Sequence, residues 1–160
     1  NGIMPMQVFD SVVYCPGAEH FFAVNLYSGQ VIWKFDYGKH SGGDNVGYGD
    51  FFINGDRLLL KPSGDHLLVF NRHTGTIIHN RLGMGYTMKG RFTHFEGKLF
   101  FIADADLKII DDFSGESLLP AIRQNHLGKL NENVVIDADT RYMYLCNYHE
   151  ALCVKLPEDL

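Results

Sequence analysis

Four short clusters of acidic residues contain the side chains best suited to chemistry. In three of the four, a histidine is the direct neighbour of the acidic residue. The clusters are Glu19-His20, Asp65-His66, Asp104 with Asp106, and His149-Glu150. Imidazole and carboxylate groups are ligands that suit zinc or manganese. Each cluster, however, lies at the tip of a different predicted hairpin, and such tips diverge instead of converging on one ion. We therefore predict no metal site and interpret these clusters as solvated hairpin ends.

The sequence contains no signature of a catalytic nucleophile with its base, since neither GxSxG nor HExxH occurs. Residues 38–49 are rich in glycine, and Gly47-Tyr48-Gly49 could suggest a phosphate-binding loop. No helix is predicted to follow this segment, so no helix dipole would face a phosphate. We predict a connecting loop at residues 38–49, no catalytic residues and no cofactor.

The chain has three cysteines, Cys15, Cys146 and Cys153, and no CxxC spacing typical of a zinc site. Cys146 and Cys153 flank His149-Glu150 symmetrically. This spacing predicts that they are partners across two antiparallel strands. Direct cross-strand disulfides are often strained, so we interpret the two cysteines as small buried residues.

An internal repeat organises the chain. Two apolar residues, Asn or Asp, two variable residues, Ser/Thr-Gly and a second apolar run occur at residues 23–33, 69–79 and 109–119. Asn25, Asn71 and Asp111 are 46 and 40 residues apart, and a less regular copy follows 44 residues later at residues 153–159. Asn or Asp can accept hydrogen bonds from the backbone two residues on, and glycine supplies a positive φ. Each copy is therefore predicted to be a tight turn between two strands.

Two further strands precede each of these turns, so the repeating unit is four antiparallel strands in about 40–46 residues, as in a β-propeller blade. We predict an all-β, single-domain propeller over residues 1–160. Its blades span approximately residues 1–37, 46–82, 90–122 and 130–160, and only residues 118–127 could form a helical turn. A WD-repeat propeller would need Gly-His and Trp-Asp marks that are absent here. A β-sandwich would leave the repeat period unexplained.

Residues 23–35, Ala-Val-Asn-Leu-Tyr-Ser-Gly-Gln-Val-Ile-Trp-Lys-Phe, resemble the repeat of the PQQ-like (quinoprotein) propeller family. In that repeat the third and fourth strands meet at a Thr/Ser-Gly turn, which an aliphatic run and a Trp follow. The resemblance implies a propeller of the kind found in quinone-dependent dehydrogenases, outer-membrane assembly lipoproteins and non-catalytic propellers. Trp33 is matched by His79 and Leu119 in the next copies, which indicates a non-enzymatic branch.

The predicted ring is incomplete, because the first blade begins at its first strand and the fourth ends after its third. An open blade edge is a liability. Either the chain is part of a larger propeller, or it completes its edges by pairing with another copy in a homo-oligomer.

Function is often carried by loops on a rigid scaffold. In a blade, the turns between the second and third strands share one face with the connections between blades. This face is our predicted partner-binding site. It comprises His20, Lys39, His40, Asp44, Asn45, Asp65, His66, Tyr86, Lys89, Arg123, Gln124, His126, His149 and Glu150.

The net charge of −5 and the pI of about 5.9 argue against broad binding to nucleic acid or to an anionic membrane. We predict a non-catalytic propeller that binds another protein, for example a bacterial partner or immunity-type protein whose acidic turns face a basic enzyme. The alternatives are a section of a PQQ-dependent dehydrogenase and a structural section of a larger chain. Residues 1–6 do not resemble a signal peptide; we expect a cytoplasmic location, or a periplasmic one if a signal has been removed.

Overall fold

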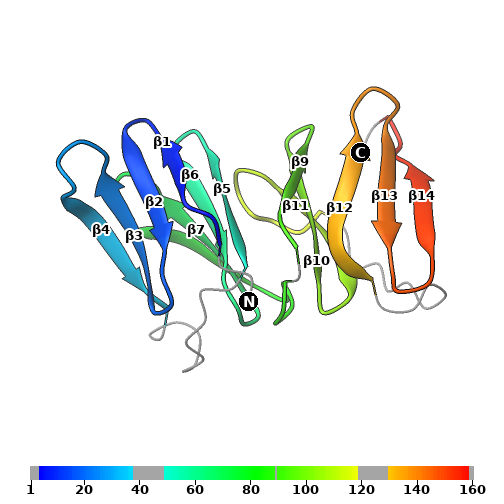
Figure 1. Ribbon diagram of the computed structural model, residues 1–160, viewed down its shortest axis with the longest axis horizontal. Coiled ribbons are helices and arrows are strands. Elements are labelled where there is room, and N and C mark those ends of the chain that lie inside the picture. Colours follow the sequence, from blue (N-terminus) through cyan, green and yellow to red (C-terminus); the bar gives the residue numbers. More distant parts are fainter. Residues whose placement is uncertain (1–3, 38–48, 89, 119–129, 159–160) are drawn as a thin grey trace.

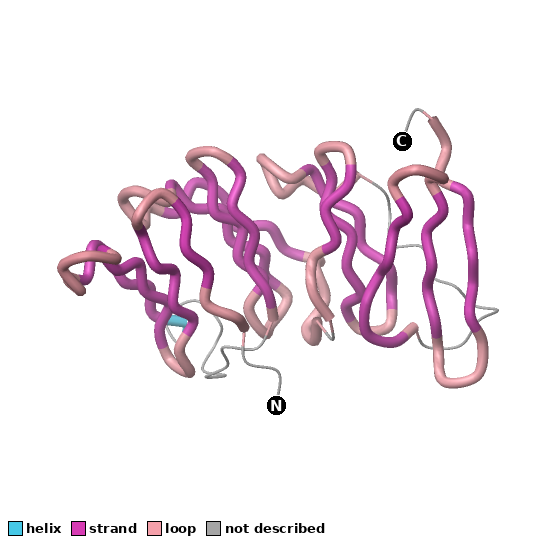
Figure 2. Tube along the Cα trace, turned by 45° about the horizontal axis from the view of Figure 1, so that its top comes forward, coloured by secondary structure: helices cyan, strands magenta, loops and turns pink. Residues whose placement is uncertain are grey.

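Four antiparallel sheets follow one another along the chain in the computed structural model, which describes residues 4–37, 49–88, 90–118 and 130–158. Figure 1 shows the sheets standing side by side in chain order, from β1–β4 to β12–β14. Figure 2 shows that strands make up most of the described trace. The described part of the chain contains no helix that is long and apolar enough to cross a membrane.

Sheets I and II each have four strands in sequential order. Sheet I comprises β1 (Gln7–Phe9), β2 (Val12–Pro16), β3 (His20–Asn25) and β4 (Val31–Asp36). Sheet II comprises β5 (Asp50–Asn54), β6 (Arg57–Lys61), β7 (His66–Asn71) and β8 (Ile77–Leu82). The two sheets also share a register irregularity at the same place, between Ala23 and Val24 in sheet I and between Val69 and Phe70 in sheet II.

Sheets III and IV have three described strands each. Sheet III comprises β9 (Thr93–Phe95), β10 (Lys98–Ala103) and β11 (Asp106–Asp111). Sheet IV comprises β12 (Asn131–Asp137), β13 (Tyr142–Cys146) and β14 (Ala151–Lys155). Of the predicted fourth strand of sheet III, the described residues include one bridge, between Ile110 and Ser117. Most of the segment predicted as a helical turn, residues 118–127, lies outside the described residues.

The repeated turns form as predicted. The side-chain oxygen Oδ1 of Asn25 accepts hydrogen bonds from the backbone N–H groups of Tyr27 and Ser28. Asn71 and Asp111 accept the corresponding bonds in sheets II and III. The glycine of each turn has φ between +67° and +70°, a conformation that disfavours other residues. The Asn/Asp-x-x-Ser/Thr-Gly motif therefore determines where the third and fourth strands meet.

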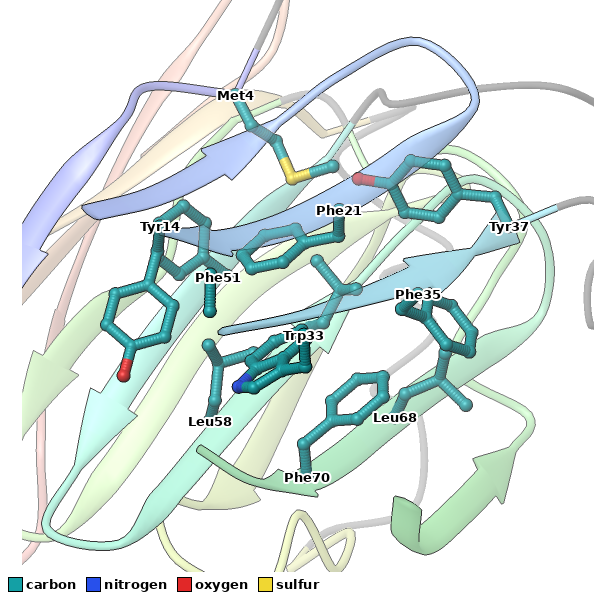
Figure 3. Close-up of a cluster of buried hydrophobic side chains, with 12 residues drawn as sticks. Met4, Tyr14, Phe21, Trp33, Phe35, Tyr37, Phe51, Leu58, Leu68 and Phe70 are labelled. Carbon is teal, nitrogen blue, oxygen red and sulfur yellow. The ribbon is translucent and has the colours of Figure 1, made fainter. Parts of the chain in front are cut away.

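The core lies between the sheets. We call the face of each sheet that points to the next sheet its front, and the opposite face its back. The front of sheet I packs on the back of sheet II through an aromatic cluster that includes Trp33, Phe21 and Phe70 (Figure 3). A second cluster joins sheets II and III, with Leu59 and Phe101 among its members. A third joins sheets III and IV. The predicted all-β fold of about four propeller blades is confirmed. Among the described residues, no sheet packs on the back of sheet I or on the front of sheet IV.

The two cysteines of sheet IV were predicted wrongly. Cys146 pairs with Ala151 and Cys153 pairs with Tyr144, so the cysteines are diagonal neighbours and not partners. Both are exposed, and neither forms a disulfide. The cause is the turn, which comprises four residues from Asn147 to Glu150 and is closed by a hydrogen bond from Asn147 N to Glu150 O. Its centre lies one residue before the centre that the sequence indicated, which shifts the pairing by two residues.

Candidate partner-binding face

The turns between the second and third strands of the sheets lie at one end of the stack, the lower end in Figure 1. We call this end the loop face. Six of the fourteen predicted site residues are described there: His20, Asp65, His66, Tyr86, His149 and Glu150. The other eight lie outside the described residues: Lys39, His40, Asp44, Asn45, Lys89, Arg123, Gln124 and His126.

Two carboxylates fasten the connection between sheets II and III. Asp65 accepts hydrogen bonds from the backbone N–H groups of Gly83, at 3.0 Å, and Gly85, at 2.7 Å. Asp104 accepts bonds from the N–H groups of Tyr86, at 2.6 Å, and Thr87, at 2.9 Å. Both aspartates thus have a structural use within the loop face, and hydrogen bonds from N–H groups to carboxylates are among the stronger ones.

Backbone contacts hold the same connection from both sides. Gly64 N donates to Tyr86 O, and Asp104 N donates to Thr87 O. Gly85 has φ of +81°, and a Cβ atom there would lie 2.8 Å from the Cβ of Ala103. Only glycine fits this close approach without displacement. Residues 83–88 are therefore fixed against the turns of two adjacent sheets, and we call them the strap.

A buried lysine lies behind the strap. Lys61 ends β6, is fully buried, and donates from Nζ to the carbonyl oxygens of Pro62 and Gly64, at 2.8 and 2.7 Å. Burial lowers the pKa of Lys61 from 10.5 to about 8, against the opposing effect of the nearby Asp104 and Asp65 carboxylates. The lysine side chain satisfies carbonyl groups that would otherwise be buried without a donor.

The lowered pKa of Lys61 predicts that the free energy of unfolding depends on pH. Above pH 8 the folded chain releases the Lys61 proton, whereas the unfolded chain retains it until its ordinary pKa of 10.5. The unfolded state then binds more protons, so the free energy of unfolding rises with pH in this window, by up to about 3 kcal/mol in total. We expect the stability of the wild type, relative to Lys61→Met, to increase between pH 8 and pH 10. Urea unfolding of both proteins under reducing conditions measures this, and a constant difference would contradict it.

Two tyrosines protrude from the loop face. Tyr86 lies in the strap and has 67% of its surface exposed, and Tyr148 at the tip of the β13–β14 turn has 79% exposed. The Tyr148 turn is also fixed, because Oδ1 of Asn147 accepts hydrogen bonds from the N–H groups of His149 and Glu150, both at 2.7 Å. Sequence reasoning identified Tyr86 but missed Tyr148, although its place between Asn147 and His149 at a hairpin tip was a usable signal.

The loop-face histidines make contacts within their own sheets. The Nε2 atom of His20 lies 3.9 Å from a carboxylate oxygen of Asp36 on the neighbouring strand. The Nδ1 atom of His66 lies 2.9 Å from the side-chain oxygen of Asn80. His149 is exposed at the end of sheet IV. Within the described ranges, no three His, Cys, Asp or Glu side chains are placed to hold a metal ion.

The opposite end of the stack contains a linkage that sequence reasoning missed. Arg72 is buried and pairs with Asp10 of sheet I, donates from Nε to Gly55 O at 2.6 Å, and lies over the ring of Phe9. Arg72 directly follows the turn residue Asn71, and at the same position in sheet III Asp112 accepts a hydrogen bond from Asn54 of sheet II. In sheets II and III the residue after the turn Asn or Asp thus contacts the preceding sheet. The sequence did not reveal this, because the residue is one of the variable positions of the repeat.

Comparison with known proteins supports the fold. No family model and no curated protein matches the chain. A quinohemoprotein alcohol dehydrogenase from Comamonas testosteroni superposes with a TM-score of 0.65 at 14% identity, over 91% of this chain and 29% of the dehydrogenase. BamB from Moraxella catarrhalis gives 0.60 at 14% identity, over 97% of this chain and 50% of BamB. The computationally designed protein Ika4 gives 0.68 at 10% identity, over 95% and 89%.

These similarities bear on architecture alone, because all three identities are low. The chain spans under a third of the dehydrogenase and half of BamB. Its four sheets therefore correspond to part of a larger propeller in both. Together with the sheet order and the inter-sheet clusters, this shows that the chain has a PQQ-like β-propeller fold in partial form.

Proposed function

We propose that this chain is a non-catalytic propeller that binds another protein through its loop face, with Tyr86 and Tyr148 as the main contacts. The observation that carries the proposal is Tyr86, a largely exposed aromatic side chain on a strap that two carboxylates and two backbone hydrogen bonds hold in place. Tyrosine is enriched among the residues that dominate binding energy at protein interfaces. A rigid support lowers the entropy that binding would otherwise cost.

The charge of the loop face bears on the kind of partner. Asp65 and Asp104 use their carboxylates on strap N–H groups, while Glu150 is exposed beside Tyr148. A basic protein would meet a net acidic chain of charge −5. A bacterial partner or immunity-type protein that neutralises a basic enzyme is the specific form of this proposal, with the tyrosines supplying affinity and the charge accelerating association.

The test compares capture by three forms of the chain. Wild type, Tyr86→Ala with Tyr148→Ala, and Tyr27→Ala are immobilised and exposed to lysate of the native host, and retained proteins are quantified by mass spectrometry. Tyr27 is the matched control, because 82% of its surface is exposed on a turn at the opposite end of the stack. We expect a partner that wild type and Tyr27→Ala retain and that the double variant loses.

Binding measurements with the purified partner then give the change in Kd for each substitution. Each single tyrosine substitution is expected to raise Kd by about tenfold or more, as is typical for aromatic contacts at the centre of an interface. The proposal fails if the partner binds wild type and double variant equally, or if the Tyr27→Ala control weakens binding as strongly.

A further inference from the structure

The back of sheet I is constructed like a packed inter-sheet face. The strand registers of sheets I and II coincide, so each residue of one has an equivalent in the other. On the back of sheet II, the buried or partly buried apolar residues include Ile53, Leu58, Leu60, Leu68, Phe70 and Ile77. Their equivalents on the back of sheet I are Val8, Val13, Cys15, Phe22, Val24 and Val31. These six are also apolar, yet Val8 and Val31 are 60% and 55% exposed.

The front of sheet IV shows the complementary pattern. Leu59, Leu67 and Val69 on the front of sheet II are fully buried against sheet III. By register, their equivalents in sheet IV are Tyr144, Ala151 and Cys153, all of which are exposed. Val135 is the equivalent of Phe52 and is 58% exposed. Both outer faces of the stack thus carry apolar side chains at positions where the inner sheets carry buried or partly buried ones.

In sheet I, Gly29 and Leu26 lie at positions whose equivalents in sheets II and III contact the preceding sheet. A Cβ atom on Gly75 would lie 2.7 Å from the ring of Trp33 in sheet I, and one on Gly115 would lie 2.7 Å from Leu67 in sheet II. The equivalent Gly29 has no described atom within 4 Å. Leu26, at the position of Arg72 and Asp112, is 45% exposed. Sheet I therefore has the features with which sheets II and III contact the sheet before them, and no neighbour for them among the described residues.

We propose that a second copy of this chain covers both outer faces, with sheet IV of each copy packed on sheet I of the other, so that two copies close one ring. The superposition on BamB favours this occupant. One copy superposes on half of the BamB chain, so two copies supply the length of one such propeller. A two-fold axis generates the same sheet IV–sheet I contact twice and leaves no apolar outer face open. A larger propeller chain was the other explanation of the open ends, and a monomeric mass for this chain would favour it.

The contacts between sheets II and III predict which residues meet across the interface between the two copies. The ring of Phe52 stacks on that of His94 in the next sheet, with centroids 4.9 Å apart. Val135 is the equivalent of Phe52 and Val8 is the equivalent of His94, since His94 pairs with Leu99 as Val8 pairs with Val13. Val135 of one copy therefore faces Val8 of the other. By the same comparison, Gly29 approaches Cys153 and Ala151 of the second copy.

The mass in solution tests the proposal first. Sedimentation equilibrium of the wild type should give twice the 18.1 kDa of the chain. Val135→Asp and Val8→Asp each place a carboxylate in the predicted contact, where burial without a partner is strongly unfavourable. Each should give a mass of 18.1 kDa with an unchanged circular dichroism spectrum. Leu82→Asp, an equally drastic change on a side chain of the inner sheet II that is 66% exposed, should leave the mass doubled.

Crosslinking tests whether Val8 of one copy lies against Val135 of the other. A chain with serine at its three cysteine positions carries Val8→Cys and Val135→Cys, and it is oxidised and run on a non-reducing gel. We expect a covalent dimer, no larger species, and no product from either single variant alone. Mixing the two single variants should restore the dimer band.

Three outcomes would overturn the inference. They are a monomeric wild type at all accessible concentrations, a ladder of higher species that indicates an open chain of copies, and a doubled mass that both aspartate variants leave intact. Tyr86 lies between sheets II and III, outside this contact, so its role in the proposed partner binding stands or fails separately.

Discussion

Replacing Trp33 with alanine is expected to lower the free energy of unfolding by about 3–5 kcal/mol, the range for a large buried aromatic residue. Trp33 is 8% exposed, and its ring stacks with two others, that of Phe21 with centroids 5.9 Å apart and that of Phe70 with centroids 6.0 Å apart. Its Nε1 group also donates a 2.7 Å hydrogen bond to the carbonyl oxygen of Arg72. The substitution therefore leaves a cavity between sheets I and II and a buried carbonyl group without its donor.

Urea unfolding monitored by far-ultraviolet circular dichroism measures this effect. Trp33→Phe retains most of the ring and loses the hydrogen bond, so it should cost about 1–2 kcal/mol. Tyr27→Ala, an exposed aromatic residue in the same sheet, should cost under about 0.5 kcal/mol. A Trp33→Ala cost below that of Trp33→Phe would show that Trp33 does not join the two sheets.

The sequence predicted the elements that depend on local chemistry. Asn25 and Gly29 determine their turn through a side-chain acceptor and a positive φ, and both effects act within five residues. The same chemistry recurs at Asn71 and Asp111, which made the repeat and the order of the sheets visible. Trp33, which belongs to the segment that resembles the family repeat, joins two sheets.

The contacts that depend on how sheets meet were not predictable in this way. Arg72 is a variable position within its own repeat, and its role arises only because Asp10 of the previous sheet lies beside it. Lys61 ends an apolar strand, a position that indicates exposure, and it is buried because the strap covers that end of sheet II. Asp65 was interpreted as a solvated hairpin end, yet its carboxylate holds the strap.

The predicted face combines residues that are exposed with residues that support the fold. Tyr86, His149 and Glu150 are exposed as a binding role requires, whereas Asp65 serves the fold as well. His20 and His66 make contacts inside separate sheets and do not come together. A residue list drawn from topology alone places side chains at one end of the stack, but it cannot separate those that support the loops from those that the loops present.

The second large expected effect is the loss of stability on replacing the turn glycine Gly75 with alanine. The equivalent Gly29 serves as the control. The two glycines have nearly identical φ values of +70° and +69°, so alanine meets the same backbone strain at both, about 1–2 kcal/mol. At Gly75 a Cβ atom would also lie 2.7–2.9 Å from three ring atoms of Trp33. Because Trp33 is stacked on both sides, it cannot move aside freely. We expect Gly75→Ala to cost about 1–3 kcal/mol more than Gly29→Ala, as overpacking of a core does.

Both substitutions are measured in the Val135→Asp background, so that self-association makes no contribution, and by urea unfolding. The extra cost at Gly75 should disappear when Trp33 is alanine, because the double variant removes the ring that the new methyl group would meet. Equal costs at Gly29 and Gly75 would show that backbone strain alone decides both positions. In the wild-type background, by contrast, Gly29→Ala should also weaken the dimer, because the second copy would then place Cys153 and Ala151 against Gly29 as sheet I places Trp33 against Gly75.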